Sequence, residues 1–255
     1  MIQILQSLIN KGNEGEPMNR YDQTTGRWAE SCTALFPLND PCSKRTSLHL
    51  YFRTSQGRQS VENLIASGYH KKFGARIADF MPIFLSLQTL DRIAAVVGIR
   101  SAAESALFLE AYLDGPLLQT LTRCGFPDVS RTEVVEIGNL VSTRSGSSFL
   151  LFLVLTKMLF ISDYKIAVFT ATSEVANLLT KLQLPISPIC KAEHSRLTPS
   201  LTNKPQADWG NYYAANPWVF AIDGRLAINS LTSRSMLAQW VATYDTEITN
   251  MRCYL

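Results

Sequence analysis

The chain has 255 residues, of which 46% are hydrophobic and 18% are charged. This composition is typical of a folded protein and excludes an intrinsically disordered chain. The 24 Lys and Arg residues and 21 Asp and Glu residues give a formal net charge of +3, which is too small to indicate a nucleic-acid partner.

The N-terminal part of the chain differs from the rest. Residues 1–45 predict an irregular extension, because glycine and proline repeatedly interrupt a polar sequence. The folded domain is expected over residues 46–255. Its first elements are a strand over Leu48–Phe52, from alternating apolar residues, a helix over Ser60–Phe73, from helical spacing, and a β-branched strand over Ile93–Ile99.

The middle of the chain predicts two more strands and a strongly apolar helix. The strands are expected over Leu107–Leu113 and Val134–Val141, and the helix over Phe149–Ile161. Such a helix is roughly 20 Å long, whereas the hydrocarbon core of a bilayer is about 30 Å thick. We therefore expect a buried core helix and no transmembrane segment.

The last part of the chain continues the alternation of strands and helices. A strand is expected over Ile166–Ala171, a helix over Glu174–Leu182, a strand over Trp218–Ile222 and a helix over Ser235–Tyr244. Helices that interrupt runs of strands indicate an α/β fold, with a mixed sheet covered by helices on both faces.

The cysteines and histidines give no sign of a metal site or a disulfide framework. The five cysteines are scattered, with no CxxC spacing, and the three histidines share no ligand spacing with them. The simpler interpretation is that the protein resides in a reducing compartment. Residues Met1–Asn10 lack the early positive charge of a secretory signal. We therefore expect a cytoplasmic protein without a bound metal.

The loop before the apolar helix is a candidate anion site. The backbone N–H groups at a helix N-terminus attract phosphate, Gly146 permits close approach of a ligand, and Arg144 adds a cation suited to phosphate oxygens. The alternative is an ordinary serine-rich turn, because the loop has one glycine and no established phosphate-binding motif.

Two acidic residues, Glu110 and Glu136, each lie in the middle of an apolar segment that is expected to be a strand. Charged side chains are rarely buried without a partner. Each glutamate therefore either faces solvent or an ion-pair partner, or lines a cleft where it can act as a general base for an amine.

Aromatic residues cluster at Trp209, Tyr212 and Tyr213. Either tyrosine could donate its phenol proton, and the cluster could line an apolar acyl pocket. The alternative is ordinary core packing, which is the more common role of such clusters.

Several segments taken together resemble the bacterial thermostable hemolysin family, which is similar in turn to the GNAT acyltransferases and the acyl-homoserine-lactone synthases. The similarity covers roughly Thr46 to Gly224. The segments that carry it are Gly98–Arg100, Leu107–Asp114, Val134–Leu140, Phe169–Thr172 and Trp209–Tyr213, followed by Pro217.

The resemblance implies a GNAT-like domain whose central sheet has two splayed strands. The strand over Val134–Val141 would part from the strand over Ile166–Ala171, and its backbone would pair with a pantetheine arm. The loop after it would receive the pyrophosphate of coenzyme A or the phosphate of an acyl carrier protein. The implied cofactor-binding residues are Asn139, Leu140, Val141, Arg144, Ser145, Gly146, Ser147, Ser148 and Asn177.

The implied reaction is transfer of an acyl group from acyl-CoA or an acyl carrier protein to a small amine, without a tightly bound cofactor. Glu136 or Glu110 would accept the amine proton, and Tyr212 or Tyr213 would protonate the leaving thiolate. The alternatives are a membrane-damaging cytolysin, as the family name suggests, and a catalytically inactive binding module with this fold.

Overall fold

A computed structural model of the chain describes residues 21–22, 27–28, 46–90, 92–144, 146–181, 184–197, 208–233 and 235–254. Within the extension expected over residues 1–45, it describes two short antiparallel strands, β1 (Tyr21–Asp22) and β2 (Arg27–Trp28). The expectations for Met1–Asn10 and for the rest of the extension lie outside the described residues.

The described part of the domain contains a seven-stranded sheet in the order β3-β4-β5-β6-β7-β9-β8. All neighbouring strands are antiparallel except β6 and β7, which are parallel. The strands are β3 (Thr46–Tyr51), β4 (Ile83–Thr89), β5 (Arg92–Ser101), β6 (Val134–Ser142), β7 (Ile166–Ala171), β8 (Ile186–Lys191) and β9 (Trp218–Asp223). The mixed sheet predicted from the sequence is confirmed.

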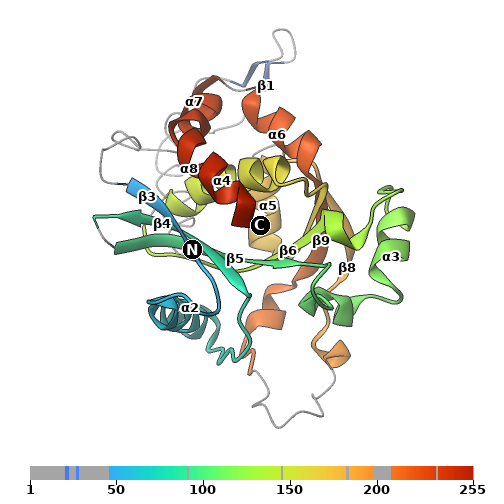
Figure 1. Cartoon of the computed structure of the whole chain (residues 1–255). Coiled ribbons are helices and arrows are strands. Elements are labelled where there is room, and N and C mark those ends of the chain that lie inside the picture. Colours follow the sequence, from blue (N-terminus) through green and yellow to red (C-terminus); the bar gives the residue numbers. More distant parts are fainter. Residues whose placement is uncertain are drawn as a thin grey trace.

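Helices cover both faces of the sheet. Figure 1 shows α2 on one face and α4, α6, α7 and α8 on the other. The α-helices are α2 (Arg58–Phe73), α3 (Leu117–Arg123), α4 (Ser147–Ile161), α5 (Ser173–Lys181), α6 (Gly224–Thr232), α7 (Ser235–Thr243) and α8 (Asp245–Met251). Two 3₁₀ helices, η1 (Phe108–Tyr112) and η4 (Tyr212–Ala215), border the site described below.

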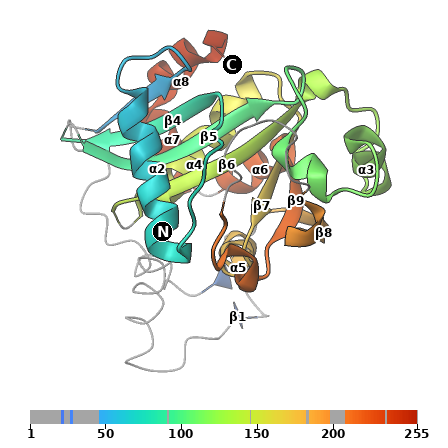
Figure 2. The same ribbon diagram turned by 90° about the horizontal axis from the view of Figure 1, so that it is seen from below.

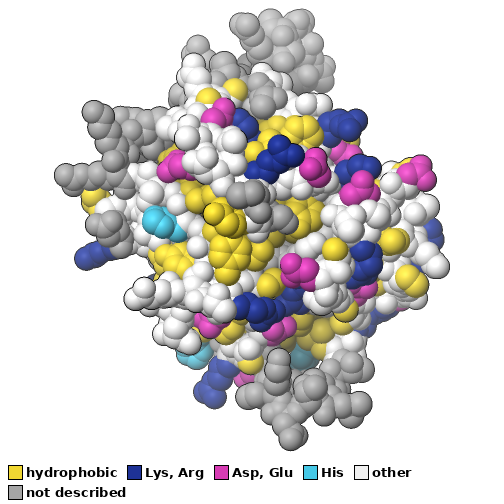
Figure 3. Space-filling model, viewed as in Figure 1, with side chains coloured by type: hydrophobic (Ala, Val, Ile, Leu, Met, Phe, Trp, Pro, Cys, Tyr) yellow, Lys and Arg dark blue, Asp and Glu magenta, His cyan; other side chains and the backbone are white. Residues whose placement is uncertain are grey.

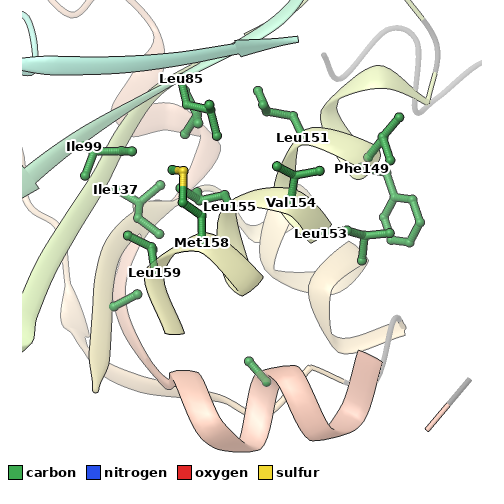
Figure 4. Close-up of a cluster of buried hydrophobic side chains, with 14 of the residues drawn as sticks. Leu85, Ile99, Ile137, Phe149, Leu151, Leu153, Val154, Leu155, Met158 and Leu159 are labelled. Carbon is green, nitrogen blue, oxygen red and sulfur yellow. The ribbon is translucent and has the colours of Figure 1, made fainter. Parts of the chain in front are cut away.

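Helix α4 is the centre of the larger hydrophobic core. Its side chains pack against inward-facing residues of β4, β5 and β6, such as Leu85, Ile99 and Ile137 (Figure 4). Residues of α6 and α8, including Leu231 and Ile248, belong to the same cluster. A helix that is apolar around most of its surface must bury most of it, and α4 does so between the sheet and these helices, although Phe160 stays exposed.

Helix α2 covers the opposite face, where it lies across β4, β5 and β6 (Figure 2). A Cβ atom at Gly68 would lie 2.8 Å from Cγ1 of Val141, so glycine allows the helix to approach β6 closely. At the start of α2, the buried Arg58 donates hydrogen bonds to the carbonyl oxygens of Met81 and Pro82, over 2.6 and 2.7 Å. Arg58 thereby fixes the segment that leads into β4.

Strands β6 and β7 part from each other halfway along their length. Their paired residues end at Ile137 and Phe169, whereas β6 continues to Ser142 without a partner residue on β7. Figure 2 shows the two strands diverging. On its other side, β6 has one more residue than β5 between consecutive pairs, and Asn139, within this bulge, has φ of 49°. The predicted splay is confirmed.

The strand predicted over Leu107–Leu113 is wrong, because Phe108–Tyr112 form the 3₁₀ helix η1. Its alternating apolar residues also suit a compact turn that buries Leu109 and Tyr112. The N–H groups of Phe108 and Leu109 bond to the carboxylate of Glu136 instead of a neighbouring strand. Strands β4 and β8 and helices α3, α6 and α8 were not predicted.

Apolar side chains gather near the centre of the face shown in Figure 3, with charged side chains around them.

None of the helices in the described part of the chain combines the length and the apolar character needed to cross a membrane.

The segment that follows residue 207 packs against the end of α2. The N–H of Asn211 donates to the carbonyl oxygen of Phe73 over 2.7 Å, and Arg76 and Asp208 form a β-bridge. Gly210 has φ of 48°, and a Cβ atom there would lie 2.2 Å from the carbonyl oxygen of Phe73. A glycine is required at this contact, because any side chain would collide with backbone.

We predict that Gly210→Ala lowers the free energy of unfolding by about 2–4 kcal/mol, from left-handed strain and overpacking together. Gly74→Ala is the matched control, because Gly74 also has positive φ but no atom lies within 4 Å of the position that a Cβ atom would take there. The control should lose only about 1 kcal/mol. Urea unfolding measures both variants, and equal losses would contradict the close-contact argument.

Candidate active site

A cavity of about 80 Å³ opens on the α2 side of the sheet, where β6 and β7 begin to part. Its walls come from α2, β5, β6, β7, η1, η4 and the segments before β4 and η4. The lining residues are Tyr69, Asp79, Met81, Arg100, Phe108, Tyr112, Glu136, Ile137, Gly138, Asn139, Thr170, Trp209 and Tyr212.

Two glycines on neighbouring strands make room for one wall of this cavity. Gly98 of β5 lies opposite Gly138 of β6, and a Cβ atom on either would approach the side chain of Met81 to within 2.6 Å. The N–H of Met81 donates to Oδ1 of Asn139 over 2.9 Å. The side chain of Met81 therefore packs directly on the backbone of the two glycines. Oδ1 of Asn139 already accepts a hydrogen bond from the protein itself.

Glu136 is the buried acid of the cavity, with an exposed fraction of only 3%. Its carboxylate oxygens accept 2.9 Å hydrogen bonds from the N–H groups of Phe108 and Leu109. Burial raises the pKa of Glu136, while these hydrogen bonds and the charge of Arg100 oppose the rise. Each carboxylate oxygen has a second lone pair, so Glu136 can still accept a proton from a ligand.

Arg100 lies directly opposite Glu136 in the pairing of β5 with β6. Nη1 of Arg100 is 3.9 Å from Oε2 of Glu136, and Nη2 is 3.6 Å from Oδ2 of Asp79. Arg100, Glu136 and Asp79 all line the cavity. The site therefore holds one cation between two carboxylates.

Glu110 does not line the cavity. Its carboxylate forms an ion pair with Arg131, with 2.7 Å between Oε1 and Nη2, and accepts a hydrogen bond from the N–H of Leu107. Partial burial would raise the pKa of Glu110, but the bonds from Arg131 and Leu107 and the charge of Arg131 lower it overall. Glu110 therefore connects η1 to Arg131, which precedes β6.

The two predicted tyrosines occupy different positions. Tyr212 lines the cavity, whereas Tyr213 does not line it and shares a 2.6 Å hydrogen bond with the hydroxyl group of Tyr112. Burial raises the pKa of Tyr212 well above its usual range and also raises that of Tyr213. Both phenols therefore keep their protons at neutral pH.

The predicted anion loop lies beyond the unpartnered part of β6. Gly146, with φ of 77°, immediately precedes α4, whose first turn contains no acidic residue. Ser147 and Ser148 are half-buried and Arg144 is exposed. Ser145 lies outside the described residues. The N-terminus of α4 can therefore receive an anion.

The remaining predicted cofactor residues are spread along the two diverging strands. Leu140 and Val141 belong to the part of β6 without a partner on β7, and Asn177 is exposed on α5, the helix after β7. None of these three residues lines the cavity.

Sequence reasoning missed Arg100 and Tyr112 as site residues. In the pairing of β5 with β6, Gly98 lies opposite Gly138 and Arg100 lies opposite Glu136. Residues two apart on a strand face the same side of a sheet, so these four residues share one face. The alternation of glycine and a charged residue on both strands was the signal that could have identified Arg100. Tyr112 could not be placed, because its segment was predicted to be a strand.

Comparisons with known proteins give one family and a set of distant structures. The family model described as thermostable hemolysin matches residues 51–228. A search of curated proteins found no match.

Three solved structures illustrate the structural likeness. The N-acyl amino acid synthase FeeM from uncultured soil microbes has a TM-score of 0.49 and 10% identity, covering 71% of this chain and 92% of its own. The CoA-dependent acyl-homoserine lactone synthase MesI has a TM-score of 0.43 and 16% identity, covering 72% and 92%. A GNAT-family acetyltransferase from Staphylococcus aureus Mu50 has a TM-score of 0.38 and 6% identity, covering 69% and 99%. These identities and TM-scores are too low to assign an activity to this chain.

The raised pKa of Glu136 predicts a pH-dependent stability. A carboxyl group whose pKa is higher in the folded state stabilises the fold below its ordinary pKa of 4.5, and that contribution is lost as pH rises through the folded-state pKa. Relative to Glu136→Gln, the wild-type protein should therefore lose free energy of unfolding as the pH is raised above 4.5. Urea unfolding across this range measures the difference. A relative gain by the wild-type protein would show that the hydrogen bonds outweigh burial.

Proposed function

This chain belongs to the thermostable hemolysin family, and we propose that it is an acyltransferase that moves an acyl group from a phosphopantetheine thioester to an amine. One observation carries the proposal: the gap between β6 and β7 has a buried carboxylate, Glu136, near its closed end and the N-terminus of α4 beyond its open end. Acyl transfer is also the chemistry for which the three similar structures are named.

The donor would lie along the unpartnered part of β6. Backbone groups from Asn139 to Val141 that face away from β5 are available to pair with the amides of a pantetheine arm. The phosphate groups would meet the N-terminus of α4 at Gly146–Ser148, with Arg144 and Ser145 in the same loop and Asn177 on α5 as a further contact. Coenzyme A and acyl carrier protein both present this arm, so either can be the donor.

The reaction then follows from the groups around the cavity. Glu136 accepts a proton from the ammonium group of the acceptor, and the freed nitrogen lone pair attacks the thioester carbonyl carbon. Backbone N–H groups of β6 stabilise the negative charge on the carbonyl oxygen. The C–N bond forms, the C–S bond breaks, and Tyr212 protonates the leaving thiolate and recovers the proton released by the nitrogen. The products are an amide and a free thiol.

We assign the proton acceptor to Glu136 rather than Glu110 because only Glu136 lines the cavity. We assign the proton donor to Tyr212 for the same reason, with Tyr213 orienting Tyr112 through their shared hydrogen bond.

The family name suggests a second candidate function, which is direct damage to membranes. Purified protein added to dye-loaded liposomes without any acyl donor distinguishes the two functions. Leakage under these conditions would support a cytolysin, whereas leakage only with donor and amine would point to an amphiphilic amide product.

We predict that Glu136→Gln lowers kcat/KM for amide formation by roughly 10²–10⁴-fold, because the general base is lost. The matched control is Glu110→Gln, which changes an acid outside the cavity and should leave turnover nearly intact. Mass spectrometry of the amide and release of free thiol measure both variants. Equal losses in the two variants, or none in Glu136→Gln, would contradict the assignment.

A second prediction concerns the donor. Arg144→Gln should raise KM for acyl-CoA about tenfold, because one charged hydrogen bond to phosphate is lost, with little change in kcat. Arg123→Gln, which removes an exposed arginine from α3, is the control. An unchanged KM in Arg144→Gln would place the phosphate groups elsewhere.

A further inference from the structure

The guanidinium group of Arg100 is nearly buried, yet no group of the described protein accepts a hydrogen bond from it. Its side chain is 11% exposed, and its closest charged partners are 3.6 and 3.9 Å away, beyond ordinary hydrogen-bond length. The side chain of Arg100 donates no hydrogen bond to any residue that the structure describes. A guanidinium has five N–H donors, and leaving buried donors without acceptors is unfavourable.

A comparison within the same molecule shows that this is a particular feature of Arg100. Arg58 is buried to a similar degree, with a side chain 9% exposed, but it donates to Glu62 and to the carbonyl oxygens of Met81 and Pro82. Arg58 is a structural arginine whose donors are occupied. Arg100 instead faces the cavity with its donors free.

The groups around Arg100 define what could bind it. Two carboxylates, Asp79 and Glu136, flank the guanidinium, so a simple anion would meet repulsion on both sides. A zwitterion would not, because its cationic group balances the carboxylates while its anionic group takes the fork of Arg100. The other walls are mainly apolar, from Met81, Phe108, Tyr112, Trp209 and Tyr212.

We propose that the acceptor is an α-amino acid, whose carboxylate is bound by Arg100 while its amine lies against Glu136. In an α-amino acid a single carbon atom separates the two groups, which matches the cross-strand juxtaposition of Arg100 and Glu136. The mainly apolar walls favour an apolar or aromatic side chain. The inference rests on the proposed acyltransferase function and specifies its second substrate.

The test compares amino acids with their carboxamides, which keep the amine and side chain but lose the negative charge. Full-length protein is given acyl-CoA with leucine, phenylalanine or tyrosine, or with leucinamide, phenylalaninamide or tyrosinamide. We expect kcat/KM for the best amino acid to exceed that for its amide at least about tenfold, the worth of a bidentate charged pair.

Substitutions then assign the preference to Arg100. Arg100→Gln should bring the ratio of amino acid to amide close to one, and Arg100→Lys, which keeps the charge without the fork, should retain part of it. Arg225→Gln, an exposed arginine on α6, should leave the ratio unchanged. Circular dichroism of each variant checks folding.

Two results would overturn the inference while leaving the acyltransferase function intact. One is equal use of amino acids and amides by the wild-type protein. The other is an equal loss of both activities in Arg100→Gln, which would mean that Arg100 only neutralises Glu136.

If no amine is acylated, the proposed function fails, and direct binding decides the inference separately. Calorimetric titration with phenylalanine and phenylalaninamide measures it. Binding of phenylalanine alone, lost in Arg100→Gln, supports the carboxylate site, and absence of binding to the wild-type protein overturns it.

Discussion

The candidate site is created by the early end of the pairing between β6 and β7. These strands pair only from Val134 to Ile137 on β6, and the bulge at Asn139 turns the remainder of β6 away from β7. Backbone groups of the remainder are left for another partner. The same divergence opens the cavity beside Glu136 and leads β6 into the loop before α4. The proposed donor path, the buried acid and the proposed anion site thus have one structural origin.

The carboxylate of Glu136 joins this sheet to the cover of the cavity. A buried charge needs compensation, and Glu136 obtains it from two N–H groups of η1 and from the neighbouring Arg100. The same contacts hold η1 in place and fix Glu136 at the cavity wall. The proposed catalytic role of Glu136 would therefore be coupled to stability, because removal of the carboxylate also leaves two backbone donors without their acceptor.

The two glutamates show how far sequence reasoning could reach into the site. Glu110 and Glu136 have the same local pattern, an acid among apolar residues, and the sequence offered no reason to prefer either. Their roles differ because Arg131 lies beside Glu110, while a cavity and the η1 backbone lie beside Glu136. Arg131 and Glu110 are 21 residues apart in the chain, so no local pattern could have paired them.

Elements with local signals could be predicted from the amino-acid sequence. The strand predicted over Ile166–Ala171 is β7, and the apolar helix and the glycine before it are α4 and its start. Periodicity and turn chemistry act between near neighbours, which is why they can be read directly. No local pattern could predict that residues 108–112 form a 3₁₀ helix or that Arg100 faces a cavity. Those outcomes depend on partners such as Phe108 and Glu136, 28 residues apart, which meet only when the sheet has assembled.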